Sequence, residues 1–543
     1  MGVPILIITS DGKELDPTVV VLSVEVRREL NRIPEAIVSL ADGSVARRKF
    51  AHSDTPFFEP GKSLTIAVRD GDTSATTLFE GLVVRHAVES RPGAGALRVE
   101  LRDPAFKLTR QRKSAVFRGQ ADDEAIRKLI VGAGLAVGEL AATGPTHDEL
   151  IQFHVSDWDF LVSRADAQGL VVDVDRATVS VRAMVPGAAP RARLEHGLDD
   201  VELELELDAG EQWAAMTGRA WDVQSLAPTA PAEARQPDVA VGNLDAAAIA
   251  RKLGGDSCAL VHPALLARGE LTAWANSRLA RSRLALLRGR VSLPGRVDLT
   301  PLDVIELGGV GERFNGKALV SGVTHTIERG AWRTELRLGL PPEPFARQPD
   351  IADLPAGGLV PPVQGLHVGV VGDFEADPLG EHRIKVLLSV LDPRQGAVWA
   401  RMARPDAGDQ RGVVFWPEPG DEVVVGFVNG DPRQAIVLGA LHGSAHAPPA
   451  AAGPPGEGNA RRAIVSKAGT VIGFDDDKRS VTIETPGKNR VVIDDAARSI
   501  TLADQHGNQI TLDARGITLK SAGDLHLDAS GDVVIKGSAV DVQ

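Results

Sequence analysis

The chain has 543 residues, a formal net charge of -13 and a single cysteine. At roughly 150 residues per domain this length predicts three or four domains. Apolar residues make up 43% and charged residues 24%, which is typical of a globular protein with buried cores. The one cysteine, Cys258, excludes an intrachain disulfide framework and a cysteine-rich zinc site.

Further classes are excluded by the order of the residues. We expect no signal peptide, because the first residues lack a basic segment and a long apolar run. No stretch approaches about 18 uninterrupted apolar residues, so no membrane-spanning helix is expected. Collagen-like and disordered chains are excluded as well. The acidic balance disfavours nucleic acid as the main partner, and 56 glycines with 34 prolines indicate many short strands and turns.

The N-terminal block, up to about residue 346, mixes strands with a few helices. Strands are expected over 18–26 and 36–40, and a turn is expected at Asp42 and Gly43. Helices are expected over 122–131, 157–167 and 270–287. We expect Asp122 and Asp157 to cap the first two helices, and Gly169 to end the second.

The third helix has the clearest pattern. It has apolar positions at Trp274, Leu279, Leu284 and Leu287, and arginines that predict a basic surface at Arg278, Arg281, Arg283 and Arg288. A stretch rich in proline and alanine, 227–239, predicts a flexible segment within this block.

Two segments rich in proline and glycine divide the rest of the chain. The expected organisation is a first domain over 1–346, a linker over 347–365, a small β domain over 366–442, a second linker over 443–458 and a repetitive domain over 459–543. Five short strands in 366–442 match a small Greek-key barrel.

The last domain is a repeat of short alternating strands. Its first apolar positions, from Ile500 to Val540, are spaced 10, 7, 8, 8 and 7 residues apart, which fits a strand of about five residues and a turn of about three. One such run has too thin an apolar face to fold alone, so we expect an intertwined trimeric β-helix or β-prism. Its predicted trimer core is Ile500, Leu502, Ile510, Leu512, Ile517, Leu519, Leu525, Leu527, Val533, Ile535, Val540 and Val542.

At this point the sequence resembles VgrG-type spike proteins of contractile injection systems over essentially its whole length. The motifs that carry the resemblance are NRIPEA at 31–36, FEPG at 58–61, LFEG at 78–81, SDWDFLVSRADAQG at 156–169, PG at 294–295, FNG at 314–316, GVTH at 322–325, GEHRIKV at 380–386, PEPGDEVVV at 417–425, FVNGDP at 427–432, IVLGAL at 436–441, SKAGTVI at 466–472 and FDDD at 474–477. The motifs of the first block are weak alone and strong in this order, and those of the middle block, 380–441, are more specific.

The resemblance implies a mainly β, multidomain fold. A phage-hub-like region of tandem β-barrels with inserted helices is followed by an OB-fold barrel and a trimeric β-helix or β-prism. It implies a structural spike, not an enzyme, with no cofactor and no metal. The implied partners are two further copies of the chain, an inner tube protein, baseplate proteins, a PAAR-type tip protein and effector cargo, with neither nucleic acid nor a membrane-spanning segment.

The end of the chain at Gln543 is similar in position to that of spikes from extracellular, phage-like particles, and leaves no room for an appended toxin. We expect assembly in the bacterial cytoplasm and action in an injection particle that is delivered or released. The choice between type VI secretion and an extracellular system stays open. A spike-associated cell-wall hydrolase and an OB-fold binding protein remain the alternatives.

Five groups of residues could carry chemistry, and each has a plainer interpretation. Ser257 and Cys258 lie in an imperfect nucleophile motif and are expected to be buried small residues. The glycines of 308–311 lack the lysine of a phosphate loop and predict a strand turn. His147, His154 and Asp157 have no usual metal-ligand spacing. His526 is expected to face water between two core leucines. Residues 475–477 predict a solvated acidic turn.

Overall fold

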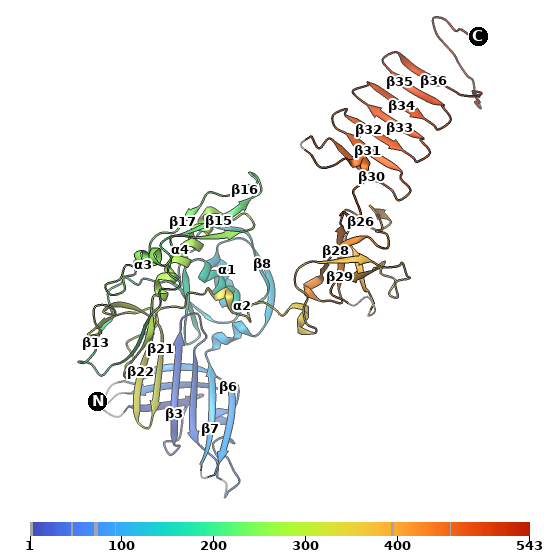
Figure 1. Ribbon diagram of the computed structural model, residues 1–543. Helices are drawn as coiled ribbons and strands as arrows, with labels where there is room; N and C mark the ends of the chain where they lie inside the picture. The colour runs from blue at the N-terminus through green and yellow to red at the C-terminus, as the bar shows by residue number, and fades with distance from the viewer. Residues whose placement is uncertain (1–3, 45–46, 70–73, 93, 392–395, 457) are drawn as a thin grey trace. The chain divides into compact units, whose positions relative to one another are not determined.

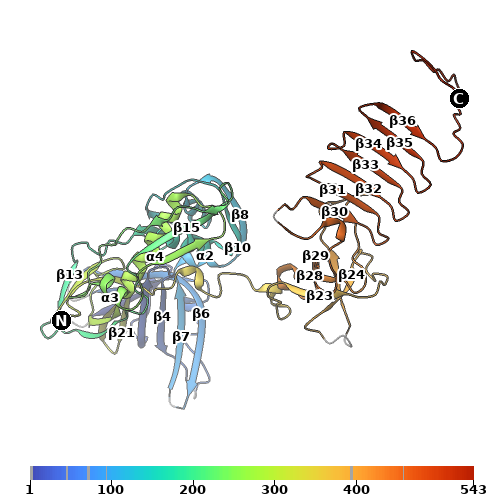
Figure 2. The same ribbon diagram turned by 45° about the horizontal axis from the view of Figure 1, so that its top comes forward.

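The structure, a computed structural model, describes residues 4–44, 47–69, 74–92, 94–391, 396–456 and 458–543 (Figure 1). The chain divides into two compact units, Met1–Asp353 and Leu354–Gln543. Strands dominate both units, which confirms the predicted mainly β fold, and the α-helices of the described residues lie in the first unit (Figure 2).

A thirteen-stranded sheet forms most of the first unit. The N-terminal strands join the later ones where β21 pairs antiparallel with β3. Two separate cores pack on this sheet, one from β1 and β3–β7 and one from β13, β14 and β19–β22. The strands are β1 (Ile5–Ser10), β2 (Lys13–Glu14), β3 (Val21–Glu29), β4 (Glu35–Ala41), β5 (Ser63–Arg69), β6 (Thr76–Arg91), β7 (Ala94–Arg102), β13 (Ala192–Glu195), β14 (Glu202–Leu207), β19 (Leu287–Pro294), β20 (Val304–Gly308), β21 (Gly316–Glu328) and β22 (Ala331–Leu338).

The helices and the smaller sheets of the first unit surround a third core. This core packs α1 and α2 on the sheet of β9, β11 and β12. The helices are α1 (Asp122–Gly132), α2 (Asp157–Ala167), α3 (Ala246–Lys252) and α4 (Arg268–Ala285). The remaining strands are β8 (Arg112–Gln120), β9 (Ala136–Leu140), β10 (His147–Ser156), β11 (Leu170–Asp175), β12 (Thr178–Ala183), β15 (Met216–Asp222), β16 (Ala227–Pro228), β17 (Ala232–Glu233) and β18 (Cys258–His262).

The predicted helices lie within two residues of their expected bounds, but both predicted caps are wrong. Ala121 is the N-cap of α1, and its N–H donates to the Glu124 carboxylate at 3.0 Å. Ser156 is the N-cap of α2, and its hydroxyl accepts from the Asp159 N–H at 3.0 Å. Asp122 and Asp157 are instead the first helical residues and are buried. Each therefore bonds to side chains of other elements.

The predicted basic surface of α4 is also wrong for two of its arginines. Arg281 and Arg283 are buried, because each has polar partners on neighbouring segments. Arg281 forms an ion pair with Asp166 of α2 and donates to the Pro341 carbonyl at 3.2 Å. The other oxygen of Asp166 accepts from the Phe345 N–H at 3.0 Å. This pair therefore fastens α2 and α4 to the segment that leaves the first unit.

Two segments that the sequence predicts to be irregular are held in place within the first unit. Residues 227–239 contain β16 and β17, which both pair with β15. The start of the 347–365 linker is also fixed, since the Arg112 guanidinium donates to the Asp350 and Ile351 carbonyls at 2.6 and 2.7 Å. Within 227–239, strand pairing therefore fixes Ala227–Pro228 and Ala232–Glu233.

The second unit begins with a closed five-stranded barrel, in the order β23, β24, β25, β29 and β28. Nine buried side chains fill it, and Val386, Val423 and Val437 are fully inaccessible. A small hairpin of β26 and β27 lies between β25 and β28 in the chain. The strands are β23 (His367–Val371), β24 (Ile384–Leu388), β25 (Val398–Met402), β26 (Ala407–Gly408), β27 (Arg411–Gly412), β28 (Glu422–Phe427) and β29 (Ala435–Ala440).

A ladder of seven strands follows the barrel. Each strand has five residues and pairs antiparallel with the next, so the order in space is the order in sequence (Figure 1). At about 4.8 Å per strand, the ladder extends about 29 Å. The strands are β30 (Arg461–Val465), β31 (Val471–Asp475), β32 (Ser480–Glu484), β33 (Arg490–Asp494), β34 (Ser499–Ala503), β35 (Gln509–Asp513) and β36 (Gly516–Lys520).

Residues 521–543 form no strand in the single chain. The sequence predicts three more strands there, around Leu525, Val533 and Val540. These strands are predicted for the intertwined trimer, and they stay a prediction. A strand needs a paired neighbour for its backbone groups and cover for its apolar side chains, and a lone chain supplies neither to this segment.

Candidate functional site: the apolar face of the C-terminal ladder

Strand alternation in the ladder separates two kinds of side chain. Ile500 lies opposite Leu512 in the pairing of β34 with β35, and Leu502 lies opposite Ile510. Successive residues of a strand point to opposite faces, so these four side chains share one face. Thr501 pairs with Thr511 on the other face. One face of the ladder is therefore aliphatic and the other is polar.

The aliphatic face continues through all seven strands. Two columns of cross-strand neighbours run along this face. Each strand contributes one apolar residue to each column, except that β30 contributes only Ile464. We call the following set the apolar ladder face: Ile464, Ile472, Phe474, Val481, Ile483, Val491, Ile493, Ile500, Leu502, Ile510, Leu512, Ile517 and Leu519. A groove of about 440 Å³ follows Ile483, Val491, Leu502 and Ile510.

Among the described residues of the second unit, most of the apolar ladder face stays open to solvent. Eight of its side chains keep 36–47% of their surface exposed, and Ile517 at the last strand keeps 71%; the eight are Ile464, Phe474, Ile483, Ile493, Ile500, Leu502, Ile510 and Leu512. Monomeric proteins rarely leave so large an aliphatic patch in water, and such a patch marks an interaction site. Each of these side chains gains roughly 1 kcal/mol when its remaining surface is covered.

The polar face has the opposite character. Its central column is Thr482, Val492, Thr501, Thr511 and Thr518. Charged residues lie toward the strand ends, among them Glu484, Asp494 and Asp513. Arg515 donates to Asp513 at 2.9 Å, and this pair lowers the pKa of the Asp513 carboxyl. The polar face is suited to contact with water.

The structure brings together six of the twelve residues predicted to form a trimer core. Ile500, Leu502, Ile510, Leu512, Ile517 and Leu519 lie side by side on the apolar ladder face. The other six, Leu525, Leu527, Val533, Ile535, Val540 and Val542, follow the last strand and keep 56–89% of their surface exposed. His526 also lies in this exposed segment. Their common packing remains a prediction.

Seven residues of the apolar ladder face are missing from the sequence-based prediction, from Ile464 to Ile493. They come earlier in the chain, where successive strands begin 9 or 10 residues apart and not 7 or 8. The signal that identifies them is the two-residue alternation itself, as in the runs VTIE at 481–484 and RVVID at 490–494. A search for alternation rather than for a fixed repeat length finds them.

The Ser257 and Cys258 motif forms no nucleophile site. Cys258 begins β18, which pairs with β15 along one edge only. Ser257 is exposed and Cys258 is partly exposed, so the prediction that they are buried is wrong. The glycines at 308–311 lie where β20 ends, as expected for a strand turn.

The three residues considered as metal ligands have separate partners. The Nε2 atoms of His147 and His154 lie 3.2 Å from an Asp122 oxygen and 3.0 Å from an Asp353 oxygen, respectively. Asp157 accepts from Gln152 at 2.9 Å and pairs with Lys113 at 2.5 Å. Across the residues that the structure describes, no group of three or more His, Cys, Asp or Glu side chains could hold a metal ion.

The acidic residues at 475–477 form a turn after β31. Asp475 accepts from the Lys478 N–H at 3.1 Å, and Asp476 forms an ion pair with Arg462. Asp476 and Asp477 are exposed. This is the solvated turn that the sequence predicts.

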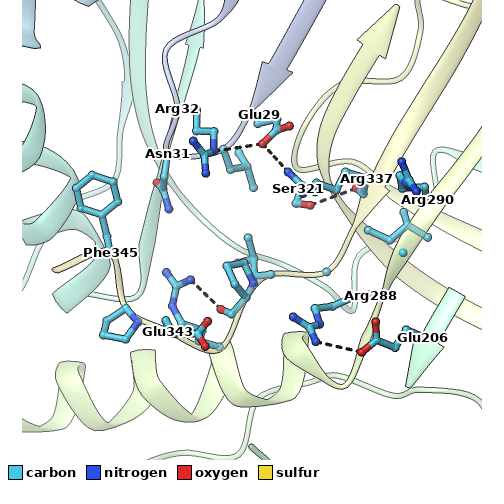
Figure 3. A pocket seen from close by; sticks show the side chains of 18 of the residues that line it. Glu29, Asn31, Arg32, Glu206, Arg288, Arg290, Ser321, Arg337, Glu343 and Phe345 are labelled. Atoms are coloured by element: carbon cyan, nitrogen blue, oxygen red, sulfur yellow. Dashed lines mark hydrogen bonds and ion pairs between the residues drawn. The ribbon is translucent and has the colours of Figure 1, made fainter. Parts of the chain in front are cut away.

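A cavity of about 870 Å³ in the first unit has several charged side chains in its lining (Figure 3). Glu29 forms ion pairs with Arg32 at 3.4 Å and with Arg337 at 2.9 Å. Arg288 donates to Glu206 at 3.4 Å. Because arginines engage these carboxylates, the pair of free carboxyl groups that glycoside hydrolysis requires is not assembled from them.

The barrel and most of the ladder fall within regions that match known domain families. Family models match the corresponding regions: a type VI secretion system/phage-baseplate injector OB domain over residues 367–442, and a phage baseplate V C-terminal trimerisation domain over residues 480–543. The chain is thus a VgrG-like spike protein. A third model, the Alg8 N-terminal domain, matches residues 2–329, which is more than half of the chain. The chain belongs to this family.

Individual proteins resemble the chain over different lengths. It is 40% identical over 55 residues to the actin cross-linking toxin VgrG1 of Vibrio cholerae, a match that spans 10% of this chain and only 5% of that protein. A tail protein from Neisseria meningitidis is 17% identical, with a TM-score of 0.48, 65% of this chain and 99% of that chain covered. An E. coli type VI secretion component is 15% identical, with a TM-score of 0.39 and coverage of 80% and 99%.

A helix that crosses a membrane must be both long and apolar. Among the described residues, no helix is both long enough and apolar enough to cross a bilayer.

Proposed function

We propose that three copies of this chain form the central spike of a contractile injection particle. The first unit forms the hub that joins the inner tube to the baseplate. The barrel forms a collar, and the three ladders form the shaft. The work comes from contraction of a sheath, and the spike transmits the axial load.

One observation carries this proposal: the apolar ladder face is continuous over seven strands and uncovered in one chain. A single-layer sheet with one bare aliphatic face is unstable alone. Three such faces that meet around an axis cover one another, and the threonine faces remain in water. The match of residues 480–543 to a trimerisation domain supports the same arrangement.

The proposed core of the shaft comprises the apolar ladder face and the predicted residues beyond it, from Leu525 to Val542. In a trimer, the segment 521–543 gains neighbouring strands that the single chain lacks. Its alternating residues then complete the shaft below β36 (Gly516–Lys520).

The proposed partners follow from this role. An inner tube protein and baseplate proteins contact the hub, a PAAR-type tip protein covers the end of the shaft, and effector cargo travels with the spike. We propose assembly in the bacterial cytoplasm and action in a delivered or released particle. The role requires neither a cofactor nor a catalytic site.

Native mass spectrometry of the full chain tests the proposal. We expect a trimer that persists on dilution, because each chain contributes more than a dozen aliphatic side chains to the contact. Coexpression of chains with two different tags should give mixed trimers. A chain that remains monomeric under folding conditions would contradict the proposal.

A further inference from the structure

The barrel of the second unit has an apolar segment that its own chain leaves uncovered. Val413, Val414, Phe415 and Trp416 follow β27 outside any strand, and each keeps 44–58% of its surface exposed. Four consecutive apolar side chains are therefore open to solvent. We call it the 413–416 segment.

The 413–416 segment is held in place despite its exposure. The Arg404 guanidinium donates to the Phe415 carbonyl at 2.8 Å and lies 4.3 Å from the centre of the Trp416 ring. Arg411 binds both oxygens of Asp406, at 2.7 and 2.8 Å, and closes the preceding hairpin. Fixing the segment before a partner arrives lowers the entropic cost of binding.

Gly412 sets the direction in which the segment leaves this hairpin. Its φ is +144°, a conformation that residues with side chains rarely adopt. An added Cβ would lie 2.5 Å from the Asp406 carbonyl oxygen. The backbone therefore requires glycine at this position, and the path of the 413–416 segment depends on it.

The same barrel has a second apolar patch, on the outer side of β23 and β29. Val368 and Val370 point outward from β23, and Leu438 points outward from β29. Leu366 and Leu438 converge over Gly426, where an added Cβ would lie 3.4 and 3.5 Å from their side chains. We call Leu366, Val368, Val370 and Leu438 the barrel strip. All four are 40–66% exposed, so the 413–416 segment of the same chain does not cover them.

The chain just after the 413–416 segment is tied to the first turn of the ladder. Glu418, two residues after Trp416, forms an ion pair with Lys467 at 2.7 Å. Lys467 lies in the turn between β30 and β31, the first two strands of the ladder. A second copy that covers the ladder is therefore brought to the edge of the barrel as well.

We infer that the 413–416 segment of one copy packs on the barrel strip of the next copy. A three-fold ring uses two different patches on each subunit, because every contact joins one patch to the other. The barrel supplies two such patches, and neither is covered within its own chain. This inference rests on the proposed trimer and extends its interface from the shaft to the collar.

Cross-linking between differently tagged chains tests the contact. In a Cys258→Ala background, one chain carries Val414→Cys and the other carries Leu438→Cys, and a short bismaleimide reagent is added to the coexpressed proteins. We expect a linked product that carries both tags. Replacing Leu438→Cys by Val390→Cys, at another exposed position of the barrel, is the matched control and should reduce the yield at least tenfold.

The outcomes separate this inference from the proposed function. A trimer by native mass that gives no product with both tags would overturn the contact and leave the trimer intact. Linking of Val414→Cys chains to one another would also overturn it, since the 413–416 segments would then meet at the axis. A monomeric chain would overturn both proposals.

Discussion

Ile500 of β34 lies directly opposite Leu512 of β35 on the apolar ladder face. Replacing both with aspartate should abolish the trimer, because three pairs of carboxylates would meet at an apolar axis, where buried charge is costly. Thr501→Asp with Thr511→Asp is the matched control. It adds the same charges to the same strands on the polar face and should leave the trimer intact. Light scattering of the full chain measures the mass, and loss of the trimer in both variants would contradict the assignment of the faces.

The buried pair of Arg281 and Asp166 should be essential to the stability of the first unit. Asp166→Ala leaves the Arg281 guanidinium buried without its carboxylate, which costs about 3–5 kcal/mol. Removing both charges, with Asp166→Asn and Arg281→Met, should cost less than the single change. Denaturant-induced unfolding of the first unit measures these differences in the free energy of unfolding.

An exposed pair provides the control for that measurement. Arg296 and Asp298 form an ion pair near the surface, so Asp298→Asn should cost less than about 1 kcal/mol. Equal costs for Asp166→Ala and Asp298→Asn would show that burial does not set the strength of the first pair.

His325 should make the first unit less stable in acid. Burial lowers the pKa of His325 to about 4, and its Nδ1 lies 3.0 Å from the Thr334 hydroxyl. The unfolded chain, with an ordinary pKa near 6.5, binds a proton that the folded chain rejects. Stability is therefore full above pH 6.5 and falls by about 3 kcal/mol as the pH drops to 4.

The variant His325→Gln, which cannot titrate, isolates this effect. The difference between the two unfolding free energies should rise with pH between 4 and 6.5 and be flat above it. A difference that is flat throughout this range would contradict a buried neutral histidine. Thermal unfolding at a series of pH values provides the measurement.

Arg112 should control the motion of the segment that leaves the first unit. Its guanidinium holds the Asp350 and Ile351 carbonyls, so Arg112→Ala should release residues 350–352. We expect hydrogen exchange there to rise at least tenfold, and trypsin to cleave faster after the exposed Arg347. Arg118→Ala, on the same strand but in an exposed pair with Glu149, is the control. Equal protection in both variants would show that Arg112 does not hold the segment.

The sequence predicts local periodic features of this fold well. The helices over 157–167 and 270–287 are recognisable from their apolar stripes, and Gly169 ends the first of them with a φ of +74°. Adjacent capping candidates are harder to separate. In the pair Ser156 and Asp157 either side chain can cap, and the choice depends on the burial of Asp157 against Gln152.

Long-range polar contacts are beyond such reasoning. From the sequence alone, the arginines of α4 resemble a solvated basic face. Asp166, the partner of the buried Arg281, lies 115 residues earlier in the chain, and local patterns do not reveal it. The sequence reveals the apolar ladder face through the alternation of apolar and polar residues. In the proposed trimer, the conformation of residues 521–543 depends on contacts with the other two copies. In a single copy, strand pairing therefore ends at β36.

The ladder also bears on how shafts of different length arise. Each strand contacts only its two neighbours, as in other repeat architectures. Because the direction alternates at every strand, insertion or deletion of two strands restores the original exit direction and the alternation of the faces. The reach of the particle is thus adjustable in steps of about 10 Å through a duplication of some twenty codons, without redesign of the hub or the collar.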